Sequence, residues 1–268
     1  MSVDISVVIL TWNSERYLAT CLKTLLSDLE LHSRSYQVYV VDNGSKDETV
    51  SLINRFYEKY PKGLLPISLR NNYGTTKSRN MALKKAAGKY ILIMDSDVSV
   101  SPGAVEVLIR TLELNSRIGI TAPLLTYPDG TLQKSTDVFP TVFTKMWRLL
   151  FLKTMEKQQN PHNTKGSLVS VDYAISAVWL MKREILNIVG LLDENIFYSP
   201  EDIDYCFRVK EAGFEVVINT ESRFIHDAQE ISRGFRFNRA KLEHAKGLAY
   251  YFWKHRYVFR KPRLPSSL

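Results

Sequence analysis

Four short apolar runs dominate the first hundred positions of the chain, and each is followed by polar turn residues. The runs are Ile5–Leu10, Gln37–Val41, Leu65–Leu69 and Tyr90–Met94. Apolar residues at helical spacing follow the turns, and continuous apolar runs of this length are typical of strands buried on both faces of a parallel sheet. Repeated strand–helix units predict an α/β protein with a doubly wound, mainly parallel sheet.

The strict alternation of strand and helix ends at the turn Tyr127–Gly130. Before this turn, the pattern predicts a helix over Pro102–Asn115 and a strand over Ile118–Ala122. After it, we expect one long strand over Val169–Met181 and then a short helix that ends at Gly190. The second half therefore departs from a simple repeat of strand and helix.

Length and composition fit one α/β domain with a C-terminal extension. The chain has 268 residues, of which 45% are hydrophobic, and this is enough to bury a sizeable core. A strand begins within the first few residues without a basic, apolar leader, so we expect neither secretion nor a membrane-spanning helix. Cys21 and Cys206 lie among apolar residues and are expected to be reduced in a cytoplasmic protein.

Basic residues are concentrated near the end of the chain. The formal net charge is +8, and residues 233–263 hold ten Lys or Arg against the single acid Glu243, which gives this segment +9 and the rest −1. We name residues 233–268 the basic tail and predict that it is helical. Its aromatic residues and charges suit an anionic partner, either phosphates or an acidic membrane surface. Alternatively, the tail is a helix packed by its aromatic side with solvated charges. The apolar and basic stretch Phe139–Met155 is either core or a lid or membrane-surface element.

Two carboxylates follow the strand that ends at Met94. Asp95 and Asp97 stand at i and i+2 of an extended chain and therefore point the same way. The carboxyl ends of strands are the ligand-binding edge of open α/β sheets. Two like charges so close repel unless one is protonated or a cation lies between them, so we expect a divalent metal that carries substrate phosphates. Alternatively, Asp97 or Ser99 caps the helix that follows.

Other polar residues are predicted to reach the same edge. Asp42, Asn72 and Gly74 follow the second and third strands. A dinucleotide-binding Gly-x-Gly-x-x-Gly motif does not follow the first strand, and no P-loop motif occurs. The ligand is therefore expected to be of another kind.

An acidic cluster opens a predicted helix in the last quarter of the chain. Glu201, Asp202 and Asp204 fall in its first turn, and Ile203 and Phe207 point inward. Acids in a first turn are favoured by the helix dipole, which is the purely structural explanation. The dipole explains their position but does not explain why there are three.

These motifs occur in a characteristic order along the chain. They are Thr11-Trp12-Asn13, Val41-Asp42-Asn43-Gly44-Ser45, Asn72-Tyr73-Gly74, Asp95-Ser96-Asp97, Glu201-Asp202-Ile203-Asp204 with Arg208, and His226. The set resembles the family 2 glycosyltransferases of GT-A fold, and within them the rhamnosyltransferase-like branch that builds bacterial surface polysaccharides. The similarity covers about residues 3–230. It implies a GT-A domain over residues 1–232, with a nucleotide-binding half (1–100) and an acceptor and metal half (101–232), followed by the basic tail.

The resemblance also implies roles for single residues. Asp42 would accept a hydrogen bond from the imide N–H of uracil or thymine. Asp97 would bind the Mg²⁺ or Mn²⁺ that bridges the donor diphosphate, and His226 would complete the metal shell. Asp202 would take the proton from the acceptor hydroxyl, while Glu201 would orient the acceptor. The implied nucleotide-binding residues are Thr11, Trp12, Asn13, Asp42, Asn72, Gly74, Arg79, Asp95 and Ser96.

The implied reaction is an inverting, metal-dependent transfer of a sugar from a UDP- or dTDP-sugar, with dTDP-rhamnose among the candidates. The acceptor would be a saccharide or a lipid-linked saccharide in bacterial surface polysaccharide synthesis. The implied partners are the donor and this acceptor, and they do not include nucleic acid. The charge and aromatic residues of the basic tail add an expected peripheral contact with an anionic surface at the inner face of the cell membrane.

Two other functional classes stay open at this point. A sugar nucleotidyltransferase would need a Gly-rich phosphate loop after the first strand, where Leu10–Asn13 offers none. A non-catalytic protein could bind an anionic surface or nucleic acid through the basic tail. The sequence also departs from the usual family pattern, with Ser176-Ala177 where Gly-Ala is common and His226-Asp227-Ala228 where His-His-Gly is common.

Overall fold

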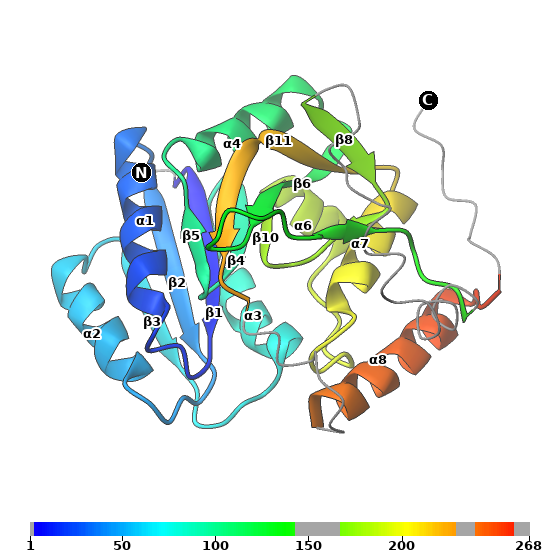
Figure 1. Ribbon diagram of the computed structural model, residues 1–268, viewed down its shortest axis with the longest axis horizontal. Helices are drawn as coiled ribbons and strands as arrows, with labels where there is room; N and C mark the ends of the chain where they lie inside the picture. Colours follow the sequence, from blue (N-terminus) through cyan, green and yellow to red (C-terminus); the bar gives the residue numbers. More distant parts are fainter. Residues whose placement is uncertain (1–2, 143–166, 229–238, 260–268) are drawn as a thin grey trace.

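The computed structural model describes residues 3–142, 167–228 and 239–259, with the backbone alone at 239–241. Within this part of the chain, nine strands form one sheet in the order β3-β2-β1-β4-β10-β6-β11-β5, with β8 paired to β11 (Figure 1). The strands are β1 (Ile5–Thr11), β2 (Tyr36–Asp42), β3 (Leu64–Ser68), β4 (Tyr90–Asp95), β5 (Val98–Val100), β6 (Ile118–Thr126), β8 (Leu168–Val171), β10 (Val178–Lys182) and β11 (Glu215–His226). A small second sheet pairs β7 (Thr136–Asp137) with β9 (Tyr173–Ala174).

The sheet is mainly parallel, as predicted. β1 runs parallel to β2 and to β4, β2 runs parallel to β3, and β11 runs parallel to β6. The exceptions are β10, which is antiparallel to both β4 and β6, and the strands β5 and β8, which are antiparallel to β11.

Helices cover both faces of the sheet (Figure 1). They are α1 (Leu18–Leu31), α2 (Thr49–Lys59), α3 (Thr75–Leu83), α4 (Ala104–Leu114), α6 (Arg183–Val189), α7 (Glu201–Glu211) and α8 (Arg239–His255). The first helix begins later than its sequence suggests. Asn13 and Ser14 are the nearest residues of the kind that favours a cap position, but Tyr17 is at the cap position of α1 and no side chain bonds to the helix end.

Two hydrophobic cores lie on opposite faces of the sheet because successive strand residues point to opposite sides. In β4, Leu92 and Met94 join the core under α1 and α4, whereas Ile91 and Ile93 join the core under α3 and α7. This is the two-sided burial that the continuous apolar runs predict. The aromatic side of α8 enters the second core, where Tyr251 is buried.

The single strand expected over Val169–Met181 is divided in three. β8 pairs with β11, β9 pairs with β7, and β10 lies between β4 and β6. The chain leaves the first ladder at Asp172, whose Oδ2 accepts a hydrogen bond from the Phe139 N–H at 2.9 Å. It turns again at Ser176 before β10 begins. The stretch expected to be one strand therefore serves three different partners, and the chain changes partner at Asp172 and at Ser176.

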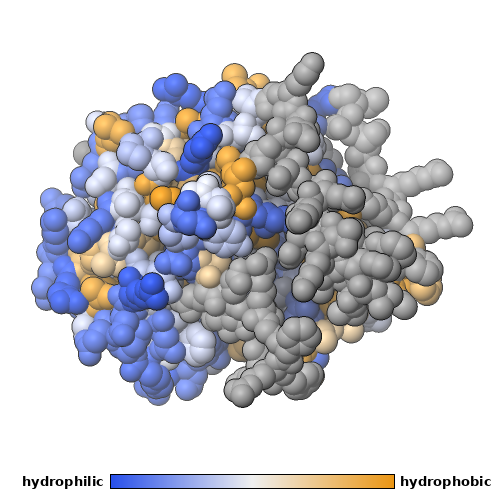
Figure 2. Space-filling model, viewed as in Figure 1, coloured by the Kyte–Doolittle hydropathy of each residue, from blue (hydrophilic) through white to orange (hydrophobic). Residues whose placement is uncertain are grey.

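The predicted helical extension is α8, which lies beside α7 (Figure 1). Phe139, at the start of the apolar stretch 139–155, is buried against Phe207, with ring centroids 5.3 Å apart. Residues 143–155 of that stretch lie outside the described residues. Hydrophilic residues cover the helices α1 and α2 at the left of Figure 2, and hydrophobic residues there occur in small groups. None of the helices that the structure describes is long and apolar enough to cross a membrane.

Candidate active site

The ends of four strands meet at one edge of the sheet. Thr11 at the end of β1 lies opposite Asp42 at the end of β2, and Asp95 ends the neighbouring strand β4. His226 ends β11, which runs beside β5. Because parallel strands end at the same edge, residues far apart in the sequence come together there.

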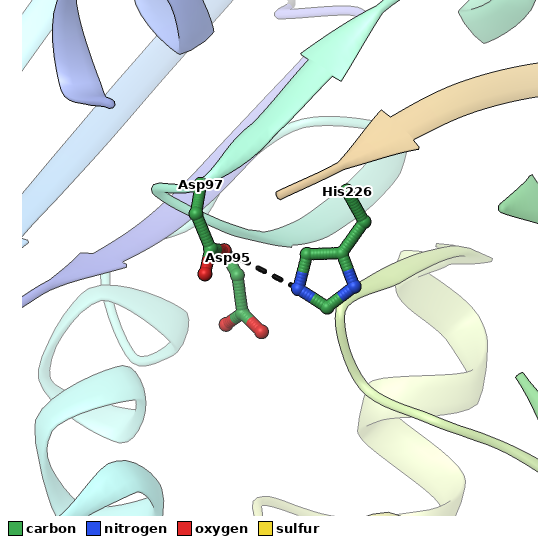
Figure 3. A group of neighbouring side chains, drawn as sticks. All are labelled: Asp95, Asp97 and His226. Atoms are coloured by element: carbon green, nitrogen blue, oxygen red, sulfur yellow. Dashed lines mark ion pairs between the residues drawn. The ribbon is translucent and has the colours of Figure 1, made fainter. Parts of the chain in front are cut away.

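Asp95, Asp97 and His226 form one group. Their potential ligand atoms all lie within 4.8 Å of one another. Figure 3 shows the two carboxylates pointing toward the same space, with the imidazole ring beside it. His226 Nε2 is 3.4 Å from Asp97 Oδ1, and the backbone N–H of Asp227 donates to the carbonyl of Asp97 at 3.0 Å, which ties the two strand ends together.

This group fits an oxygen-preferring divalent cation. Two carboxylates and one imidazole are donors that suit Mn²⁺ or Mg²⁺ and leave coordination positions for phosphate oxygens. The Nδ1 atom of His226 lies 2.8 Å from Gln133 Oε1, so a proton on Nδ1 could be donated to Gln133 and Nε2 would be left to bind a cation. Burial disfavours the imidazolium, but the hydrogen bond and charge of Asp97 outweigh it and raise the pKa of His226.

Thr11 and Asp42 form a buried polar corner beside this group. Asp42 is 2% exposed, and both of its carboxylate oxygens accept from the Ser45 backbone N–H at 3.3 Å. Thr11 Oγ1 is buried without a hydrogen-bond partner among the described residues. Buried polar atoms are normally paired, so this hydroxyl has capacity for a ligand.

The loop after β1 carries other predicted residues. Trp12 is 44% exposed. Asn13 adopts a φ of +49°, and its Oδ1 accepts from the Lys46 N–H at 2.8 Å, so this side chain shapes the loop. Ser96, which follows β4, is buried against this loop, and its hydroxyl lies 2.9 Å from that of Ser14. Trp12 is therefore the member of this loop with an exposed ring that can stack on a ligand.

Asn43, which carries no individual role among the predicted site residues, organises the loop after β3. Its Nδ2 donates to Asn72 Oδ1 at 3.0 Å, and its Oδ1 accepts from the Tyr73 N–H at 2.9 Å. Gly74 has a φ of +85°, and a Cβ at this position would lie 2.2 Å from the Phe197 carbonyl oxygen. The predicted residues Asn72 and Gly74 thus also build the frame of the site, and only glycine fits at 74.

A buried arginine joins two parts of the site. Arg79 is 1% exposed, and its Nη2 pairs with Asp95 Oδ1 at 2.5 Å. Its Nη1 donates to Ser176 Oγ at 2.8 Å and lies 3.7 Å from Glu201 Oε1, and the Ser176 hydroxyl donates to the same Glu201 oxygen at 2.9 Å. Burial and the Asp97 charge raise the pKa of Asp95, although Arg79 opposes them. Ser176, seen in the sequence only as a departure from Gly, is thus a link in this chain of contacts.

Glu201 and Asp202 begin α7 at the same edge. Burial, followed by the negative charge of Asp202, raises the pKa of Glu201 to about 8. Asp202 is only partly buried, and its Oδ1 accepts from the Ile203 N–H at 2.8 Å.

The other acids of this region are held by ion pairs with basic side chains. Asp204 is almost fully buried and pairs with Arg208 Nε at 3.0 Å, Lys254 Nζ at 2.7 Å and His255 Nε2 at 2.8 Å. Lys254 Nζ also lies 2.7 Å from Asp193 Oδ2. Ion pairing, in addition to the helix dipole, therefore explains Asp204.

Comparison with known proteins identifies the family. The model of the family described as "Glycosyl transferase family 2" matches residues 6–190. The chain belongs to this family. It is 27% identical over 224 residues to N-acetylglucosaminyl-diphospho-decaprenol L-rhamnosyltransferase of Mycobacterium tuberculosis, with 76% of this chain and 71% of that protein covered. It is also 26% identical over 269 residues to poly(ribitol-phosphate) beta-glucosyltransferase of Bacillus spizizenii, which covers 89% of this chain and 41% of that protein.

Solved structures share the GT-A fold of this family 2 member. The structure titled "GalNAc-T7 with UDP, GalNAc and Mn2+" has a TM-score of 0.71 at 15% identity and covers 94% of this chain and 48% of that chain. The mannosyltransferase of Pyrobaculum calidifontis, solved with GDP-Man and Mn²⁺, has a TM-score of 0.66 at 18% identity, with 99% of this chain and 66% of that chain covered. The prediction of a GT-A fold is confirmed, and this chain spans about half to two thirds of these solved chains.

Proposed function

We propose that this family 2 member is an inverting, metal-dependent glycosyltransferase that uses a UDP- or dTDP-linked sugar. The observation that carries the proposal is the convergence of three groups on one sheet edge: the Thr11–Asp42 corner, the Asp95–Asp97–His226 group, and the Glu201–Asp202 pair joined to Asp95 through Arg79. In this proposal residues 1–100 bind the nucleotide, while residues 101–232 supply the acceptor side and the histidine of the metal group.

The nucleoside would lie against the first two strand ends. Asp42 is a carboxylate acceptor suited to the imide N–H of uracil or thymine. The unpartnered Thr11 hydroxyl lies on the opposite strand end, and exposed Trp12 offers a ring face for stacking. Asn72 and Gly74 would complete the wall on the ribose side.

Asp97 and His226, with Asp95 beside them, would hold Mg²⁺ or Mn²⁺. When bound, the cation supplies the positive charge that stabilises a leaving nucleoside diphosphate. Arg79 holds Asp95 in place through their ion pair, and Ser96 fixes the backbone between the two carboxylates through its contact with Ser14. The named ligands of two solved relatives, UDP or GDP-Man together with Mn²⁺, support this assignment.

Asp202 would act as the general base. It would take the proton from the acceptor hydroxyl as the oxygen attacks the anomeric carbon opposite the leaving group, and a single in-line displacement inverts configuration. With a pKa of about 8, Glu201 would keep its proton at neutral pH. A protonated Glu201 can orient the acceptor by hydrogen bonding, while Asp202 accepts the proton.

The donor and acceptor are proposed from the relatives. By its name, the mycobacterial protein is an L-rhamnosyltransferase that acts on N-acetylglucosaminyl-diphospho-decaprenol, which supports dTDP-rhamnose and a lipid-linked saccharide for this chain. The Bacillus relative acts on poly(ribitol phosphate) by its name, which supports a cell-surface polymer. We therefore place the reaction in bacterial surface polysaccharide synthesis.

We also propose a cytoplasmic location with peripheral contact at the inner face of the membrane. The support is the charge of +9 on residues 233–263 together with Trp253 on α8, which is 74% exposed. Basic residues and exposed aromatic rings are the combination that binds an anionic bilayer surface reversibly.

The experiment that tests the enzymatic proposal is a donor screen followed by one substitution. UDP-glucose, UDP-GlcNAc and dTDP-rhamnose are compared by thermal shift with Mn²⁺ and with EDTA, and release of UDP or dTDP is then measured. We expect one donor class to stabilise the protein only with Mn²⁺. Asp202→Asn should keep that stabilisation and lower turnover by about 10² to 10⁴.

Glu211→Gln is the matched control, because Glu211 is exposed at the other end of α7. It should behave as the wild type does. Full turnover in excess EDTA would contradict the metal requirement, and a near-normal rate for Asp202→Asn would contradict the role of Asp202.

A further inference from the structure

Lys254 of α8 closes residues 193–204 into a loop that is held at both ends. We name these residues the acidic segment. The Lys254 ammonium lies 2.7 Å from Asp193 Oδ2 at the first residue and 2.7 Å from Asp204 Oδ1 at the last. Glu201 and Asp202 lie between these two attachment points. One side chain from the basic tail thus fixes both ends of the segment that carries them.

α8 also contacts the middle of the acidic segment. Gly247 lies so close that a Cβ there would be 2.2 Å from the Ser199 carbonyl oxygen. His244 Nδ1 lies 2.9 Å from the Ser199 hydroxyl. Glycine is unfavourable inside a helix, and here the approach of the Ser199 backbone leaves no room for any other residue. The contact lies two residues before Glu201.

The acidic segment is held from its other side by α3. The Thr75 N–H donates to the Phe197 carbonyl at 2.7 Å, and the Thr76 hydroxyl donates to the Ile196 carbonyl at 2.6 Å. Thr75 begins the helix that follows Gly74 of the proposed donor site. The segment therefore lies between the donor half and α8, with contacts on both sides.

We propose that α8 is part of the catalytic apparatus and that Lys254 is a positioning residue for Asp202. The inference rests on the proposed function, because it assumes that Asp202 is the base. A general base must reach within about 3 Å of the hydroxyl, and a small misplacement of a reacting group lowers the rate strongly. By holding the segment at both ends, Lys254 keeps the Asp202 carboxylate at the distance from the donor site that proton transfer requires.

The test is Lys254→Met in the full chain, since methionine keeps the length of the side chain and removes its charge. Lys246→Met is the matched control, because Lys246 lies on the same helix, is 61% exposed and pairs with Glu243 of that helix rather than with the acidic segment. We expect Lys254→Met to lower UDP or dTDP release by roughly 10- to 100-fold. The Kd for UDP with Mn²⁺ should remain close to the wild-type value, because the donor residues lie elsewhere.

Two further readouts separate positioning from general stability. Amide hydrogen exchange should rise in residues 193–204 and remain at the wild-type level in β1, β2 and β4. Lys254→Arg, which keeps the charge, should restore a large part of the rate. Gly247→Ala, which removes no charged side chain and must displace Ser199, should lower the rate in the same way, with unchanged affinity for UDP and Mn²⁺.

The outcomes are distinguishable from those of the proposed function. If Asp202→Asn turns over normally, the proposed function fails whatever Lys254→Met does. If Asp202→Asn is inactive while Lys254→Met and Gly247→Ala match the wild type, the inference about α8 is overturned. It is equally overturned if both variants raise hydrogen exchange throughout the chain and weaken UDP binding, because α8 would then serve only the stability of the fold.

Discussion

Replacement of Glu201 by Gln should change how the stability of the protein depends on pH. Glu201 is buried beside Asp202, and burial first, then that negative charge, raises its pKa from 4.5 to about 8. The folded protein therefore holds the proton more tightly than the unfolded chain does. For an acid with a raised pKa, the stability is fully present below pH 4.5 and is lost as the pH rises toward 8. The amide introduced by Glu201→Gln has no such proton to lose.

The size of the effect follows from the two pKa values. Each pKa unit of difference corresponds to about 1.4 kcal/mol. As the pH rises from 5 to 9, ionisation of Glu201 should lower the free energy of unfolding of the wild type by about 4 kcal/mol in total. At pH 5 the two proteins should be similarly stable, because Gln has nearly the shape of protonated Glu. At pH 9 Glu201→Gln should be more stable by about 4 kcal/mol.

The assay is urea unfolding of both proteins at pH 5, 6, 7, 8 and 9 without divalent metal, with Glu211→Gln as the exposed control. The difference in free energy between Glu201→Gln and wild type should grow with pH, whereas that of the control should stay constant. Parallel curves for Glu201→Gln and wild type would refute the reasoning. They would mean that Arg79, whose Nη1 is 3.7 Å from Glu201 Oε1, keeps the carboxylate ionised throughout.

Three further predictions concern binding. Asp42→Ala should weaken UDP or dTDP binding by about 1 to 3 kcal/mol, the range for removing a charged hydrogen-bond acceptor, and an unchanged Kd by calorimetry would exclude its role in base recognition. Asp97→Asn should raise the Kd for Mn²⁺ in the presence of UDP by roughly tenfold or more. Asp129→Asn, in an exposed turn, should leave this Kd unchanged. If Asp97→Asn binds Mn²⁺ as tightly as the wild type, the metal site lies elsewhere. The full chain should sediment with anionic vesicles at low salt and be released as the salt concentration rises, because each basic residue near the surface adds about 1 kcal/mol within a Debye length. Equal binding to anionic and neutral vesicles, or no binding to either, would exclude the membrane contact.

The parts of the fold that depend on local pattern could be predicted from the sequence. The strands β1, β2, β3 and β4 are continuous apolar runs, and a parallel sheet necessarily brings their carboxyl ends to one edge. For this reason Thr11, Asp42 and Asp95 could be expected to lie together. The alternation of side chains along a strand likewise explains why Leu92 and Ile93 lie in different cores.

The parts that depend on distant partners could not be predicted. Asp172 and Ser176 mark the two breaks within Val169–Met181, but the three partners of the resulting strands lie far away in the sequence. Gln133 and Asn43 are ordinary polar residues until the fold brings them to His226 and Asn72. The strong charge of the basic tail indicated an external anion, yet Lys254 is used on two carboxylates of the same chain.

The antiparallel strand β10 has a consequence for how this protein is made. β4 has β1 on one side and β10 on the other, and β10 ends at Lys182, far along the chain from the end of β4 at Asp95. During synthesis, β4 therefore leaves the ribosome as an exposed edge strand, open to pairing with other chains. The free edge of β4 stays open until β10 has emerged and can pair with it. A ribosome stalled between β4 and β10 would release a fragment that holds both Asp95 and Asp97 and is prone to aggregate.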